Sequence, residues 1–167
     1  MAFPAFFDEV PPLTLRDPLA EILGAAAGGL IEYRFADAVR LAGHSCPTVA
    51  GAWLMTTRAL RALYPAAIPE RGAVDVAFGD RQDAGVTGVI ASVATLLTGA
   101  AGSGGFKGLA GRFSRRDLLR FEVAGVDELR FTRRDTGETV DIGLDLSPVA
   151  GDPRMGALLP ALLAGAA

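Results

Sequence analysis

The order of the hydrophobic patterns along the chain limits the possible folds more than any other feature of the sequence. Helical spacing of apolar residues predicts a long helix from residue 47 to about residue 64, and the apolar stretch 86–98 is long enough for a buried helix. Three segments with strand character follow, at 118–123, 126–133 and 139–145. Helices thus precede consecutive strands without βαβ repetition, which predicts an α+β fold with a mixed, largely antiparallel sheet covered by helices.

Shorter patterns fill the rest of this arrangement. Pro18 follows Asp17 as a helix start, and Gly43 is a residue type that ends helices in a left-handed conformation. The patterns predict a helix from Asp17 to about Gly28, an extended segment at 30–33, a helix at 35–43, a strand at 74–78, a turn at 135–138 and a terminal helix that begins at Pro153. We treat residues 1–167 as one domain, preceded by a Phe- and Pro-rich arm at 1–15.

The only histidine and the only cysteine of the chain stand two positions apart, in Gly43-His44-Ser45-Cys46-Pro47. Imidazole and thiolate are the side chains that transition metals bind best near neutral pH. Pro47 suits the first position of a helix, so the pair is expected at a helix N-terminus, which favours the thiolate form of a cysteine. His44 and Cys46 are therefore the predicted metal ligands, most readily for zinc, and Cys46 is also the candidate catalytic residue.

Two further segments offer weaker candidates. Asp80 and Asp83 lie on a loop between predicted elements and could add carboxylate ligands to the metal, although solvated turn residues are the commoner case. The glycine-dense segment 99–108 lacks the pattern of a phosphate-binding P-loop. Its free backbone N–H groups, with Gly105, Lys107 and Arg112, could still bind a carboxylate or phosphate of a small-molecule ligand.

Composition excludes several classes of partner. A net charge of −3, with 16 basic and 19 acidic residues, argues against broad nucleic-acid binding, and no apolar run is long enough for a membrane span. One cysteine excludes an intramolecular disulfide, and no secretion signal is evident, so we expect a cytoplasmic protein.

The motif also carries a resemblance. Segment 37–48 resembles the His-Gly-His-x-Cys-Pro-Gly segment of the FmdE family, which takes its name from one of the subunits of formylmethanofuran dehydrogenase. Leu-Thr-Gly at 97–99 with Gly-Phe-Lys-Gly at 105–108 resembles a second block of that family. Ala42 stands where the family has its first histidine, and Thr48 where it has glycine. The resemblance implies a metal at His44 and Cys46, a fold like the catalytic domain of glyceraldehyde phosphate dehydrogenase, and a homodimer.

Three functions remain open on the sequence. The first is a metal-dependent protein, for example an enzyme acting on a small anionic substrate, whose remaining ligands come from Asp80, Asp83, water or a second subunit. The second is a haem or tetrapyrrole binder that uses Cys46 or His44 as an axial ligand. The third is a non-catalytic accessory subunit. A homodimer contact through Phe3, Phe6 and Phe7 is expected, because three exposed rings would form an apolar patch.

Overall fold

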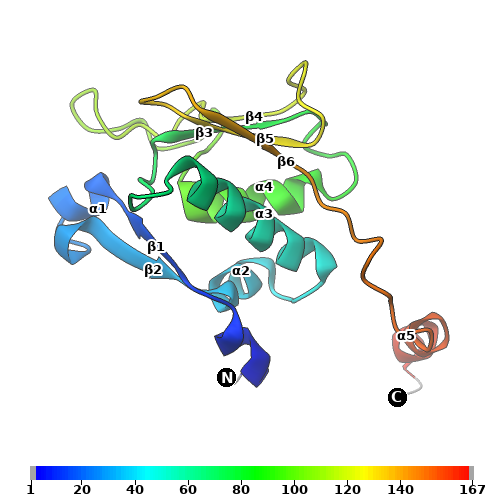
Figure 1. Cartoon of the computed structure of the whole chain (residues 1–167). Helices are drawn as coiled ribbons and strands as arrows, with labels where there is room; N and C mark the ends of the chain where they lie inside the picture. The colour runs from blue at the N-terminus through cyan, green and yellow to red at the C-terminus, as the bar shows by residue number, and fades with distance from the viewer. Residues whose placement is uncertain (1–2, 166–167) are drawn as a thin grey trace.

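The computed structural model describes residues 3–165 and shows the predicted α+β fold, with two sheets and helices against the larger one (Figure 1). In chain order the elements are η1 (Ala5–Glu9), β1 (Leu13–Arg16), α1 (Pro18–Ile22), η2 (Ala27–Gly29), β2 (Leu30–Tyr33), α2 (Phe35–Ala42), α3 (Pro47–Leu63), β3 (Val74–Phe78), α4 (Thr87–Thr98), β4 (Leu119–Arg120), β5 (Leu129–Arg133), β6 (Thr139–Ile142) and α5 (Met155–Leu163). None of the helices within residues 3–165 has the length and apolar character that a membrane crossing requires.

The larger sheet has the strand order β4-β3-β5-β6 and is mixed, as predicted. β3 pairs parallel to β4 and antiparallel to β5, and β5 pairs antiparallel to β6. The alternating side chains of Val74, Val76 and Phe78 are buried, because α3 and α4 cover that face of the sheet (Figure 1). The β5–β6 turn falls at the predicted residues, where Gly137 takes a positive φ of 74°.

Helices α3 and α4 form the centre of the core and agree closely with the sequence prediction. Pro47 begins α3, and Gly99, with φ of 72°, ends α4 in the left-handed conformation. Trp53 is 2% exposed, so it is a core residue. The hydroxyls of Thr56 and Thr57 donate to backbone carbonyls one turn earlier, which satisfies these polar groups inside the core.

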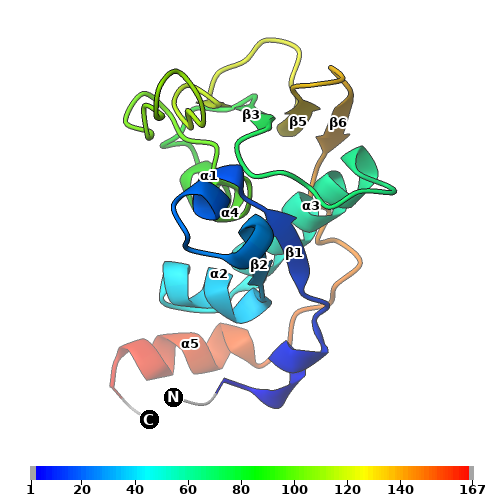
Figure 2. The same ribbon diagram turned by 90° about the vertical axis from the view of Figure 1, so that its left-hand side faces the viewer.

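The N-terminal half departs from the prediction in three respects. α1 ends at Ile22 instead of about Gly28, because Gly24 adopts a positive φ of 68° and turns the chain. Strand β1, which the sequence patterns did not predict, pairs antiparallel with β2 in a separate two-stranded sheet (Figure 2). Phe7 of the arm is 6% exposed and packs edge-on against Phe35, so this ring belongs to the core of its own chain.

The last strands are shorter than predicted. β4 contains two residues, because Glu122 takes a positive φ of 57° and Gly125 one of 78°, and both bend the chain away from the sheet. α5 forms near the predicted position, but none of its side chains is buried. Figure 1 shows it at the end of an extended segment, apart from the sheet.

A buried carboxylate joins the N-terminal segment to the rest of the chain. Asp17 caps α1 by accepting hydrogen bonds from the backbone N–H groups of Leu19 and Ala20. Its side chain, 5% exposed, also pairs with Arg71 at 2.8 Å and with Arg115 at 2.6 Å. Burial acts to raise the pKa of Asp17, but the two guanidinium groups and the helix N–H groups outweigh it and lower the pKa below its ordinary value.

The same cluster reaches the C-terminal end of α4. Arg71 donates two further hydrogen bonds, from Nε to the carbonyl oxygen of Leu97 at 3.1 Å and from Nη2 to that of Leu96 at 2.9 Å. A cation at the C-terminal end of a helix is favourable, because the last carbonyls lack helical partners. Asp17 and Arg71 therefore connect α1, the segment before β3 and α4.

We predict that Asp17→Asn lowers the free energy of unfolding by about 3–5 kcal/mol, because it leaves the buried Arg115 and the partly buried Arg71 without their carboxylate. Asp83→Asn is the matched control. Its ion pair with Arg81 is exposed and should contribute less than about 1 kcal/mol. Urea unfolding at neutral pH measures both, and equal losses would contradict the structural role of Asp17.

The pH dependence of the Asp17 contribution follows from the direction of its pKa shift. A carboxyl group with a lowered pKa in the folded state stabilises the fold above its unfolded pKa of about 3.9. This stabilisation should disappear as the pH falls through the lower folded-state pKa. The gap in stability between wild type and Asp17→Asn should therefore close in acid, as measured by urea unfolding at a series of pH values.

Candidate functional site

The segment that holds His44 and Cys46 connects α2 to α3 on the surface of the molecule. Gly43 ends α2 with φ of 76°, and Cys46 is the extended N-cap residue of α3, followed by Pro47 at the first helical position. His44 is exposed, whereas Cys46 is partly buried and packs against the core. The predicted placement of the pair at a helix N-terminus is therefore confirmed.

The imidazole of His44 is oriented by the backbone. Nδ1 lies 3.0 Å from the carbonyl oxygen of Ala42. A carbonyl only accepts, so Nδ1 carries a hydrogen and donates it. This leaves Nε2 available as a ligand or proton acceptor. Metal-bound histidines commonly donate their second N–H to a backbone carbonyl in this way.

His44 and Cys46 also influence each other's ionisation. The hydrogen bond to Ala42, followed by the interaction with Cys46, raises the pKa of the His44 imidazole. Partial burial acts to raise the pKa of the Cys46 thiol, but the backbone N–H groups of Val49 and Thr48 and the His44 imidazole outweigh it and lower the pKa. In metal-free protein both shifts favour the charged forms of the two groups, as expected for a cysteine at a helix N-terminus. A metal ion that binds the pair would replace the proton on Nε2.

A small cleft lies beside His44, between α2 and α4. It has a volume of about 160 Å³ and is lined by Leu41, Ala42, Val89, Ser92 and Val93 together with His44, whereas Cys46 is not part of this lining. The one hydroxyl of the lining, that of Ser92, donates to the carbonyl of Gly88. The cleft is smaller than the roughly 300–1,000 Å³ of common small-molecule sites, so it gives no support to a haem pocket.

The weaker metal candidates stay apart from the pair. Asp83 binds Arg81 in an exposed ion pair, and the backbone carbonyl of Asp80 accepts a hydrogen bond from the N–H of Glu122. Within residues 3–165, no three or more His, Cys, Asp or Glu side chains gather into a group that could hold a metal ion. Each chain thus presents two strong ligands, His44 and Cys46.

The predicted anion-binding residues are also separated. Lys107 is exposed on the glycine loop. Gly105 packs closely on the segment that follows: a Cβ built on it would lie 2.9 Å from the carbonyl oxygen of Arg115. Arg112 instead lines a pocket that includes neither of these residues, together with Arg16, Arg71, Arg115 and Arg134.

No sequence pattern indicated that Arg16, Arg71 and Arg134 belong together with Arg112. These residues come from four separate segments of the chain, and no spacing rule relates them. The one available signal was Asp17 before Pro18, which predicted a helix cap but not the arginines that the same carboxylate binds.

Comparison with known proteins adds no relative: no family model, no curated protein and no solved structure matches this chain. The resemblance of segments 37–48 and 97–108 to the FmdE family therefore remains a prediction from the sequence.

We predict that Cys46 in folded, metal-free protein reacts with iodoacetamide at a lower pH than the same thiol in urea-unfolded protein, because its pKa is lowered. His44→Ala should move the pH profile upward, since it removes one of the groups that favour the thiolate. Ser45→Ala, a change between the two residues, should leave the profile in place. Superimposable profiles for folded and unfolded protein would contradict the prediction.

Proposed function

We propose that this protein binds a zinc-like divalent metal through His44 and Cys46 and that a second copy of the chain completes the site. The observation that carries the proposal is the oriented pair itself: one imidazole with Nε2 available and one thiol with a lowered pKa, both on the segment that begins α3. Nitrogen and thiolate sulfur are the preferred ligands of zinc. The donor chemistry therefore fits the metal.

The number of ligands is the reason to invoke a second copy. Structural zinc sites have four protein ligands and catalytic sites ordinarily have three. The described part of one chain supplies two. Two chains related by a two-fold axis would supply two imidazoles and two thiolates, the Cys2His2 set of structural zinc, and the two thiolate charges would balance the charge of the ion.

Exposed apolar residues near the pair support such an association. Leu41, beside His44, is 50% exposed. Leu54, about two turns along α3 from Cys46, is 45% exposed. Apolar side chains that surround a polar site are typical of surfaces that become buried on binding.

Helix α5 gives a second reason to expect association. Its large apolar residues all face solvent in the single chain: Met155, Leu158, Leu159, Leu162 and Leu163. A helix that is apolar on most of its surface is normally buried. We infer that α5 packs on the second copy. Of the three arm rings expected at this contact, Phe6 is the exposed one, because Phe7 is buried and Phe3 lies under the guanidinium of Arg40.

The assembled site would hold metal in a closed environment. Four protein ligands leave no open position for a substrate, so the bound metal would keep both thiolates ionised and link the two chains. The small anionic substrate that the sequence suggested has no place at such a closed site.

Cobalt titration of metal-free, untagged protein tests the proposal, because Co²⁺ bound by thiolate absorbs light and Zn²⁺ does not. We expect saturation at one metal ion per two chains, with conversion to a dimer over the same range as followed by light scattering. Cys46→Ser and His44→Ala should each abolish binding. Asp83→Asn should bind like wild type.

Three results would overturn the proposal. A monomer that saturates at one metal ion per chain would place the missing ligands within the chain or in solvent. Binding that survives both Cys46→Ser and His44→Ala would place the metal elsewhere. Failure to bind cobalt or zinc would show that the protein has no site for such a metal. A haem absorption band in the purified protein would favour the axial-ligand alternative.

A further inference from the structure

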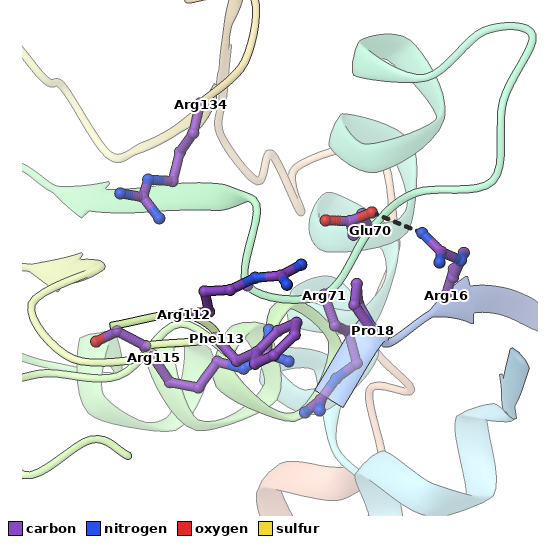
Figure 3. Close-up of a pocket in the computed structure, with 10 residues that line it drawn as sticks. Arg16, Pro18, Glu70, Arg71, Arg112, Phe113, Arg115 and Arg134 are labelled. Atoms are coloured by element: carbon purple, nitrogen blue, oxygen red, sulfur yellow. Dashed lines mark hydrogen bonds and ion pairs between the residues drawn. The ribbon is translucent and has the colours of Figure 1, made fainter. Parts of the chain in front are cut away.

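A pocket of about 440 Å³ lies where β1 ends, beside the segment before β3 and the loop before β4 (Figure 3). It is separate from the His44 cleft: the first turns of α4 line that cleft, whereas the last carbonyls of α4 bind Arg71 of this pocket. Five arginines line it, Arg16, Arg71, Arg112, Arg115 and Arg134, and Glu70 is the one acidic residue among its lining side chains. The volume is within the range of small-molecule sites.

Two of the arginines form the buried side of the pocket. Arg71 and Arg115 share the single carboxylate of Asp17, so this buried group carries one positive charge in excess. Arg115 is 7% exposed, and its Nη1 is buried without a hydrogen-bond partner in the structure. Burial lowers the pKa of Arg115, which reflects the cost of an incompletely compensated charge.

Gly72 gives Arg115 the space that it occupies. A Cβ built on Gly72 would fall 1.7 Å from Nη1 of Arg115. Any larger residue would displace the guanidinium, and Gly72 also lines the pocket. The excess positive charge is thus held in the lining of the pocket, next to Gly72.

Two other arginines in the lining of the pocket, Arg112 and Arg134, are not bound to Asp17. Arg112 forms no ion pair within residues 3–165, and its guanidinium lies over the ring of Phe113 at 4.8 Å from the ring centre. Arg134 directly follows β5, and its nearest carboxylate, Asp75, is 3.9 Å away. Figure 3 shows these two side chains approaching from different elements.

The fifth arginine is fully neutralised. Arg16 pairs with two carboxylates, Glu21 at 2.7 Å and Glu70 at 3.1 Å, so this exposed group carries one negative charge in excess, and the positive charge of the pocket comes from its other four arginines. Phe113, which lines the pocket next to Arg112, has a positive φ of 62°, and this is strained for an aromatic residue. Strain of this kind is found most often at ligand sites.

We propose that this pocket binds a small organic dianion through its phosphate or carboxylate oxygens. Arg112 and Arg134 would donate to the oxyanion, because guanidinium groups match carboxylate and phosphate geometry. Arg71 and Arg115 would attract it from the buried side without direct contact. The ligand would supply the negative charge that Asp17 and Glu70 leave unbalanced.

Isothermal titration calorimetry of the full chain tests the proposal, with phosphate, succinate and citrate as probes at constant ionic strength in chloride. We expect saturable binding of at least one probe, and the stronger of phosphate and succinate identifies the ligand chemistry. The double variant Arg112→Gln/Arg134→Gln should bind that probe about ten-fold or more weakly, since two charge-assisted hydrogen bonds are lost.

Arg58→Gln/Arg154→Gln is the matched control, because it removes two exposed arginines outside the pocket and the same total charge. It should bind the probe like wild type. An equal loss in both double variants would show general charge attraction and overturn the proposal, as would the absence of saturable binding for all three probes. Cys46→Ser should bind the probe normally, so this result is independent of the metal site.

Discussion

The ion-pair cluster around Asp17 is the interaction on which most of the remaining structure depends. One carboxylate caps α1 and binds two arginines that come from 54 and 98 positions further along the chain, and these contacts hold the loop that carries Arg112. A balanced buried ion pair contributes little net stability, because desolvation offsets the attraction. Here two cations share one anion, so the cluster retains a positive charge. Such an imbalance is difficult to explain as a stabilising device and is readily explained as part of a ligand site.

The sequence predicted those parts of the fold in which local pattern and tertiary packing agree. The boundaries of α2, α3, β3 and α4 follow from apolar periodicity, Pro47 and the glycines at their ends. The prediction failed for β1, which is four residues long and pairs with a strand in another segment, and for α1, where exposed Ile22 and Leu23 formed a helical pattern without a buried face.

The two candidate sites also differ in how far the sequence predicted them, because one is formed by sequence neighbours and the other by distant segments. His44 and Cys46 are neighbours in the sequence, so a local turn places them together, and their position at the start of α3 follows from Pro47. The arginine pocket assembles four separate segments of the chain, and of its arginines only Arg112, close to the glycine-dense segment 99–108, was a predicted site residue. Sequence spacing carries no information about residues that meet through loop closure.

Helix α4 relates the two sites without merging them. Its first turns contribute Val89, Ser92 and Val93 to the cleft beside His44, whereas its last carbonyls bind Arg71 behind the arginine pocket. Along the axis of α4 the cleft residues and the carbonyls that bind Arg71 are therefore about 5–12 Å apart. The two sites share no lining residue, so substitutions in one remove no side chain from the other. Because α4 packs against α3 and β3, the core of the fold holds the residues of both proposed sites in place.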